Sequence, residues 1–111
     1  MNFNEYQELA GRTDTQKNLI YHSIGICNEA GEYLGKIKKI MRGDDGIFDA
    51  MGNLTRQTKE FLRDELGDVL WYVSRAAAAL GFTLEEVADH NIKKLEDRAA
   101  RGVIKGSGDN R

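Results

Sequence analysis

The sequence predicts an all-α fold: a helical bundle of three long helices and a short N-terminal helix. Three observations support this prediction. The 111 residues include no proline, which would interrupt a helix. Apolar residues recur at helical spacing through the long segments, and most of the twelve glycines lie between those segments or in the tail. Because the length is typical of one domain, we expect residues 1–111 to form a single domain.

The first half of the chain predicts two helices. Residues 3–10 form the short one, and Thr-Asp-Thr at 13–15 offers N-cap candidates for a long helix that runs to about residue 41. The apolar stripe of the long helix comprises Ile20, Ile24, Cys27, Gly31, Leu34 and Met41. A single cysteine can form neither an intrachain disulfide nor a multi-cysteine zinc site, so we expect Cys27 to be a small core residue.

The second half predicts two more helices. The segment RGDDGIFDAMGNLTRQ is a loop, and a third helix follows from about residue 55 to residue 80, ended by Gly81. Its apolar face comprises Leu62, Leu66, Val69, Leu70, Val73, Ala77 and Leu80. Thr83 and Glu86 form a capping box that opens a fourth helix ending near residue 101. The glycine-rich residues 102–111 are typical of a flexible tail.

Two features of the long helices call for a partner or a ligand. Phe61, Trp71 and Tyr72 lie off the main stripe of the third helix, which is more aromatic surface than a small monomeric bundle covers, so we expect a partner subunit. Glycines inside helices, Gly25 among them, cost stability and indicate either close helix approach or room for a ligand.

Composition excludes several classes of partner. A net charge of -2 gives no bulk attraction for a nucleic-acid polymer or an anionic membrane. No run of about 18 apolar residues exists, and the N-terminus lacks the pattern of a signal peptide. We therefore expect neither membrane nor nucleic-acid binding, and a cytoplasmic location.

Paired carboxylates on two consecutive long helices are the strongest chemical signal. Glu29 and Glu32 are three residues apart, and so are Glu65 and Asp68, so each pair shares one helix face. Two antiparallel helices can present all four to one space, where they repel one another unless cations neutralise them. Oxygen-only ligands favour Mg²⁺ or Mn²⁺ over zinc. The alternative is a solvated network in which each pair binds nearby lysines or arginines, such as Glu32 with Lys36.

The fourth helix carries a polar stripe of Asn91, Lys94 and Arg98. Beside a carboxylate-metal site, such donors suit a polyphosphate, because metal takes some phosphate oxygens and the cations take others. The alternative is an ordinary basic helix C-terminus, favoured by the helix dipole.

Taken in order, these motifs resemble the MazG-like branch of the all-α nucleoside triphosphate pyrophosphohydrolase superfamily. NEAGEYLGKIKK is similar to the family's first acidic helix, ELGDVLWY to its second, and RGVIKGSGDNR to the tail of short phage and bacterial members. The resemblance implies Mg²⁺-dependent hydrolysis of a (deoxy)nucleoside triphosphate to a monophosphate and pyrophosphate, with Mn²⁺ able to substitute, in nucleotide-pool control. It also implies a homodimer or homotetramer with active sites near subunit contacts, in the cytoplasm of a bacterium or of a phage's host.

The resemblance also implies roles for individual residues. Four match metal ligands, Glu29, Glu32, Glu65 and Asp68, and Glu29 or Glu32 could orient the attacking water as general base. Lys94 and Arg98, with Asn91 beside them, match positions near the phosphates, and Gly25 would leave space for the nucleotide. The tail donors Lys105 and Arg111 would close over bound nucleotide.

Two rival functions remain at this point. A redox di-metal carboxylate bundle needs Glu-x-x-His on two helices, and the sequence has no such pair. A non-catalytic helical interaction module would leave the acidic and basic stripes as solvated faces. Metal titration separates the module from the enzyme, because only the enzyme gains thermal stability with Mg²⁺ and a non-hydrolysable nucleotide.

Overall fold

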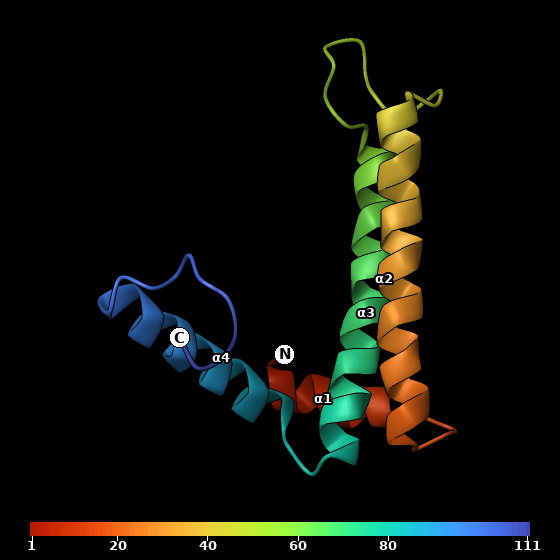
Figure 1. The fold of residues 1–111 in the computed structure, drawn as a ribbon. Helices are drawn as coiled ribbons and strands as arrows, with labels where there is room; N and C mark the ends of the chain where they lie inside the picture. The colour runs from red at the N-terminus through yellow and green to blue at the C-terminus, as the bar shows by residue number, and fades with distance from the viewer.

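A computed structural model describes all 111 residues and contains four helices (Figure 1). They are α1 (Phe3–Gly11), α2 (Leu19–Arg42), α3 (Arg56–Ala79) and α4 (Leu84–Ala100). No strand forms; a single isolated bridge joins Phe48 to Leu54 within the loop between α2 and α3. The all-α prediction is confirmed, with three long helices and a short one.

Local signals explain where most helices begin and end. The Thr83 side chain accepts from the Glu86 N–H while the Glu86 carboxylate accepts from the Thr83 N–H, which is the predicted capping box. Gly43 ends α2 with φ of 78°, a left-handed conformation that favours glycine. The predicted and observed ends of α3 and α4 agree within a residue or two.

The start of α2 differs from the prediction. The N-cap is Asn18, whose side chain accepts from the Tyr21 N–H, and none of the residues at 13–15 caps the helix. Instead, one Asp14 carboxylate oxygen accepts the N–H groups of Gln16 and Lys17 in a turn. Because its carboxylate is also bound by Arg75 of α3, Asp14 connects the α1–α2 turn to the third helix rather than capping the second.

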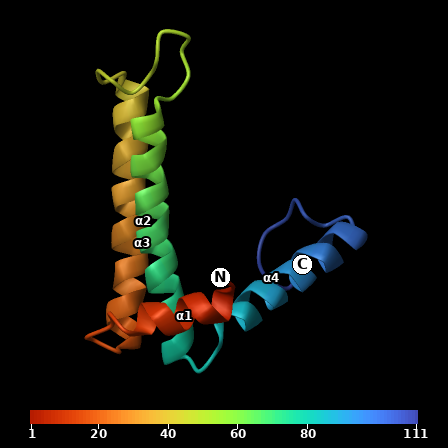
Figure 2. The same cartoon turned by 180° about the vertical axis from the view of Figure 1, so that it is seen from behind.

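α2 and α3 form a long helical hairpin, side by side along their length in both views (Figures 1 and 2). The Tyr72 ring of α3 packs directly on the α2 backbone at Gly25, where a Cβ would lie 2.2 Å from Cδ1 of Tyr72. This side-chain packing explains the glycine. The expectation that Gly25 leaves space for a nucleotide is wrong, because the Tyr72 ring fills that space.

α1 crosses the foot of the hairpin and ties α3 to α4. Its Gln7 side chain donates to the carbonyls of Ser74 and Phe82 and accepts from the Leu84 N–H. α4 contacts α1 and α3 but not α2, and it extends away from the hairpin in both views (Figures 1 and 2). The four helices of one chain therefore do not close into a compact bundle.

Much apolar surface stays uncovered in a single chain. The Cα radius of gyration is 17.3 Å, against about 13 Å expected for a compact domain of this length. The exposed side chains include most of the predicted stripe of α2, with Ile20 at 71%, Ile24 at 64%, Leu34 at 63% and Met41 at 84%. Cys27 of that stripe is also exposed, so its predicted core position is wrong within one chain. Trp71 and Tyr72, expected to be surplus surface, are instead half-buried against α2.

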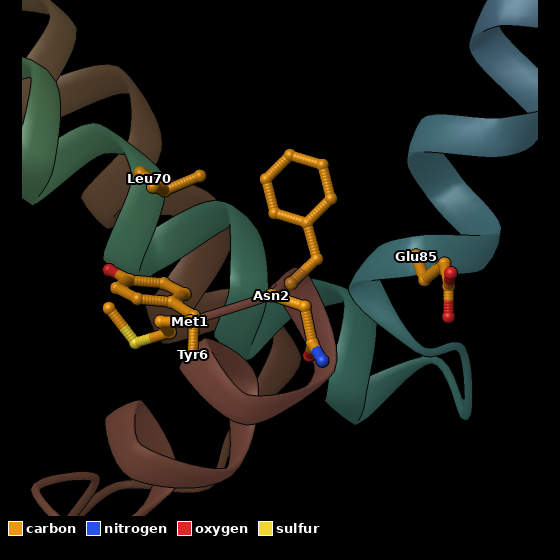
Figure 3. Close-up of a pocket in the computed structure, with 6 residues that line it drawn as sticks. Met1, Asn2, Tyr6, Leu70 and Glu85 are labelled. Atoms are coloured by element: carbon orange, nitrogen blue, oxygen red, sulfur yellow. The ribbon is translucent and has the colours of Figure 1, made fainter.

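An open hollow of about 410 Å³ lies where α1, α3 and the start of α4 meet (Figure 3). Its lining is mainly apolar and comprises Met1, Asn2, Phe3, Tyr6, Leu70 and Glu85. Burial and the nearby Asp68 carboxylate raise the pKa of Tyr6. The hollow therefore borders the side of α3 on which Asp68 lies. None of the helices is long and apolar enough to cross a membrane.

Candidate active site

Three of the four predicted carboxylates meet between α2 and α3. Oxygen atoms of Glu29, Glu65 and Asp68 all lie within 4.8 Å of one another. Glu29 and Glu65 are half-buried and Asp68 is exposed. The antiparallel hairpin therefore brings the two i,i+3 motifs together, with ligand atoms close enough to share one cation.

Glu32 lies at the rim of this group. Its side chain is exposed, and it is not among the three carboxylates that come within sharing distance. It still acts on the cluster through space. Burial first, then the charges of Asp68, Glu65 and Glu32, raise the pKa of Glu29.

None of the four carboxylates forms an ion pair within the chain. The solvated-network alternative expected such pairs, for example Glu32 with Lys36. Instead, the Lys36 ammonium lies 5.4 Å from the centroid of the Phe61 ring. The carboxylates repel one another with no protein cation bound to them, a charge arrangement that a divalent cation would relieve.

Two aromatic side chains of α3 complete the surroundings of the cluster. Glu29, Asp68, Trp71 and Tyr72 line a cavity of about 320 Å³. The neighbouring Tyr21 side chain, then burial, then the charges of Glu29 and Asp68 raise the pKa of Tyr72. Tyr72 is a site residue that the sequence motifs did not predict. The available signal was its spacing, because a residue four positions after Asp68 lies on the same helix face.

Buried polar groups pack against these two aromatic side chains, Trp71 and Tyr72. His22 is fully buried, and its Nε2 lies 2.9 Å from Oδ2 of Asp14. The same oxygen accepts a hydrogen bond from Nε of Arg75 at 2.9 Å. The His22 ring packs edge-on against Trp71, with ring centroids 5.7 Å apart. The Trp71 indole N–H donates to Thr13 Oγ1 at 3.0 Å, so both ends of the indole are held.

The polar residues of α4 lie apart from the acidic cluster within one chain, since α4 makes no contact with α2 and extends away from the α2–α3 hairpin (Figures 1 and 2). Asn91 is exposed, Lys94 is half-buried and Arg98 is buried. Lys94 Nζ and Arg98 Nη2 both bind Oδ1 of Asp109, at 3.2 Å and 3.0 Å. The structure thus groups Lys94 with Arg98 but does not join them to Glu29, Glu65 and Asp68.

The tail folds back along α4 as a loop, although its composition is typical of a flexible segment. The Arg111 guanidinium donates to the carbonyls of Val103, Ile104 and Gly108. Arg101 Nη2 in turn donates to the Arg111 carbonyl at 2.6 Å. Arg111 is therefore occupied by its own backbone, whereas Lys105 is exposed.

Comparison with known proteins places this geometry in a family. Residues 16–103 match the MazG nucleotide pyrophosphohydrolase domain. The chain belongs to the MazG family. It is also 44% identical over 102 residues to the Gene 37 protein of Mycobacterium phage L5, an alignment that covers 92% of this chain and 84% of the phage protein. No solved structure matches the chain.

The MazG assignment fits the chemistry of the carboxylate group. Divalent-metal dependence is general in this family, and the donors that meet here are all carboxylate oxygens, which hard divalent cations prefer. The matched region includes both acidic motifs and the polar stripe of α4, and it ends before most of the tail. At the level of the family, the chain is a nucleotide pyrophosphohydrolase.

Proposed function

We propose that this MazG-family chain is a Mg²⁺-dependent enzyme that hydrolyses a (deoxy)nucleoside triphosphate to a monophosphate and pyrophosphate. The observation that carries the proposal is the group of Glu29, Glu65 and Asp68, brought within 4.8 Å of one another with no ion-paired lysine or arginine. Nucleotide-pool control in the cytoplasm, where the substrates occur, is the role that fits this activity.

We assign metal binding to Glu29, Glu65 and Asp68, with Glu32 adjoining them. Bound Mg²⁺, or Mn²⁺ in its place, would neutralise phosphate charge and lower the pKa of the attacking water. Glu32 lies outside the three-carboxylate group, so it stays free to accept a proton from that water and to orient it toward the α-phosphorus. Glu29 is the other candidate for this role, and its raised pKa favours acceptance of a proton.

We propose that the phosphate-binding cations, Lys94 and Arg98, come from another subunit. α4 carries Asn91, Lys94 and Arg98 away from the acidic cluster of its own chain, while α2 exposes a stripe of large apolar side chains. A homodimer or homotetramer that covers the stripe would bring α4 of one copy to the carboxylates of another. Lys94 and Arg98 would then stabilise charge on the leaving pyrophosphate. Lys105 and the tail loop held by Arg111 would lie beside them.

The test is a screen of the common ribo- and deoxynucleoside triphosphates for pyrophosphate release. We expect at least one to be hydrolysed with Mg²⁺ or Mn²⁺, and we expect activity to vanish in excess chelator and return when the metal is restored. Activity that persists in chelator would exclude the metal mechanism. Absence of hydrolysis of every nucleotide, with no gain of thermal stability from Mg²⁺ plus a non-hydrolysable analogue, would favour the interaction module instead.

A further inference from the structure

The contact between the tail and α4 has a chemical consequence for phosphate binding. Asp109 places one carboxylate oxygen, Oδ1, within hydrogen-bond distance of both Lys94 Nζ and Arg98 Nη2. A phosphate oxygen uses the same two donors in the same way, as an anionic acceptor shared between an ammonium and a guanidinium. A carboxylate of the chain itself therefore occupies the position that the proposed function gives to a phosphate.

The tail is built to hold that carboxylate in place. Gly108, directly before Asp109, has φ of 77°. Arg111 closes the loop through three backbone carbonyls, and a Cβ at Gly106 would lie 2.4 Å from Cδ of Arg111. The loop thus presents Asp109 to α4 with its backbone fixed on both sides.

The Asp109 carboxylate is ionised, and its ion pairs with Lys94 and Arg98 can dissociate. Hydrogen bonds from Arg98 and Lys94 lower the pKa of Asp109, so it is ionised at neutral pH. Its side chain is 81% exposed, and ion pairs at such a surface position are weak and screened by salt. Arg98, in contrast, is only 6% exposed and its Nη2 is bound by Asp109, so a ligand that uses this nitrogen must displace the carboxylate.

We propose that Asp109 is an internal competitor of the substrate's phosphates for Lys94 and Arg98. The proposal rests on the proposed function, because it takes these cations as the phosphate-binding groups. A nucleoside triphosphate displaces the carboxylate, and the tail returns when pyrophosphate leaves, which lowers the affinity for product as well as for substrate. No covalent step is involved.

The test compares Asp109→Asn with a matched variant, Asp89→Asn. Asp89 is an exposed aspartate of α4 that is paired with Lys93 and not with Lys94 or Arg98, so its substitution changes the net charge equally without touching the tail contact. Binding of inorganic pyrophosphate and of inorganic tripolyphosphate is measured calorimetrically in chelator, so that protein cations alone bind the ligand. We expect Asp109→Asn to bind both about two- to thirtyfold more tightly than wild type, from the loss of two ion pairs to an exposed carboxylate. Asp89→Asn should match wild type.

Comparing pyrophosphate with tripolyphosphate distinguishes competition by Asp109 from a general effect of net charge. A carboxylate that must be displaced lowers the affinity of every competing ligand by one common factor, so both gains should be equal. A gain that grows with ligand charge, an equal gain in Asp89→Asn, an affinity loss in Asp109→Asn, or no binding by any of the proteins would each overturn the proposal. Hydrolysis is assayed separately: absence of hydrolysis in wild type refutes the proposed function, whereas the phosphate affinities decide the role of Asp109.

Discussion

At the scale of single residues, Glu65 tests the acidic cluster most simply. Glu65→Gln removes one charge and keeps the shape, and we expect turnover to fall by at least about 10²-fold at saturating Mg²⁺, since metal-site charge supplies several kcal/mol of transition-state stabilisation. Asp64→Asn is the matched control, because Asp64 is the preceding residue of the same helix and binds exposed Arg63. Steady-state kinetics on both folded variants provide the measurement; wild-type turnover in Glu65→Gln would exclude this residue from the site.

Asp14 makes a pH-dependent contribution to stability. Burial alone would raise its pKa, but hydrogen bonds from the Lys17 N–H, Arg75 and the Gln16 N–H, together with His22, lower it from 3.8 to about 2. Because the pKa of Asp14 is lower in the folded chain than in the unfolded chain, ionised Asp14 stabilises the protein at pH values above its unfolded pKa. This contribution, about 2 kcal/mol, is lost as the pH falls from about 4 through about 2.

We therefore expect Asp14→Asn to lower the free energy of unfolding by at least about 2 kcal/mol near neutral pH, because it breaks a buried charge pair. The difference from wild type should shrink as the pH falls from 4 to 2. Chemical denaturation across this range is the measurement. A difference that stays constant with pH would show that the Asp14 carboxylate has the same pKa in the folded and unfolded chains.

Residue spacing predicted the acidic pairs but not their surroundings. The i,i+3 rule places Glu65 and Asp68 on one face from the sequence alone. It cannot say which face meets the neighbouring helix, and so Cys27 was expected in the core and is exposed, while Tyr72 was expected on the surface and lines the cavity. The face of α2 that contacts α3 depends on the packing of Tyr72 against Gly25, a tertiary contact that residue spacing does not reveal.

At the scale of helices, Gly25 sets the separation of α2 and α3. An added methyl group would overlap the Tyr72 ring, so we expect Gly25→Ala to cost about 1–3 kcal/mol of stability through overpacking. Gly35 of the same helix has no heavy atom within 4 Å of an added Cβ. Gly35→Ala should therefore stabilise the chain by up to about 1 kcal/mol through helix propensity. Denaturation midpoints measure both; equal effects of the two substitutions would contradict the close contact.

Helix boundaries show where local signals suffice. The capping box at Thr83 and Glu86 is local, and it was predicted correctly. Thr13, Asp14 and Thr15 are equally good caps by residue type, but Asp14 is bound by Arg75, which lies 61 residues away in the sequence. A long-range ion pair therefore overrides a local preference. The tail loop is a similar case, since a single arginine organises a segment whose composition is typical of disorder.

At the scale of the whole molecule, the exposed stripe of α2 predicts self-association. We expect a solution mass of at least twice 12.5 kDa, measured by analytical ultracentrifugation. Ile24→Glu places a charge on the stripe and should dissociate the oligomer and abolish activity together. Gln57→Glu adds the same charge at an exposed position of α3 away from the stripe and should change neither. A fully active wild-type monomer would contradict a site shared between subunits.

The arrangement of α4 could not be predicted from the sequence. Periodicity identifies its apolar face but not the surface that covers it, and within one chain Val87 and Leu95 of that face are each 39% exposed. The sequence therefore predicted the four helices correctly, whereas the closed bundle that it suggested does not form within one chain.

Hydrolysis in ¹⁸O-labelled water tests the central claim most directly. Attack by water at the α-phosphorus places the label in the nucleoside monophosphate and leaves pyrophosphate unlabelled, and this is the outcome we predict with Mg²⁺ present. Label in orthophosphate, or a nucleoside diphosphate as the first nucleotide product, would show attack at the γ-phosphorus and contradict the assignment of this chain as a pyrophosphohydrolase.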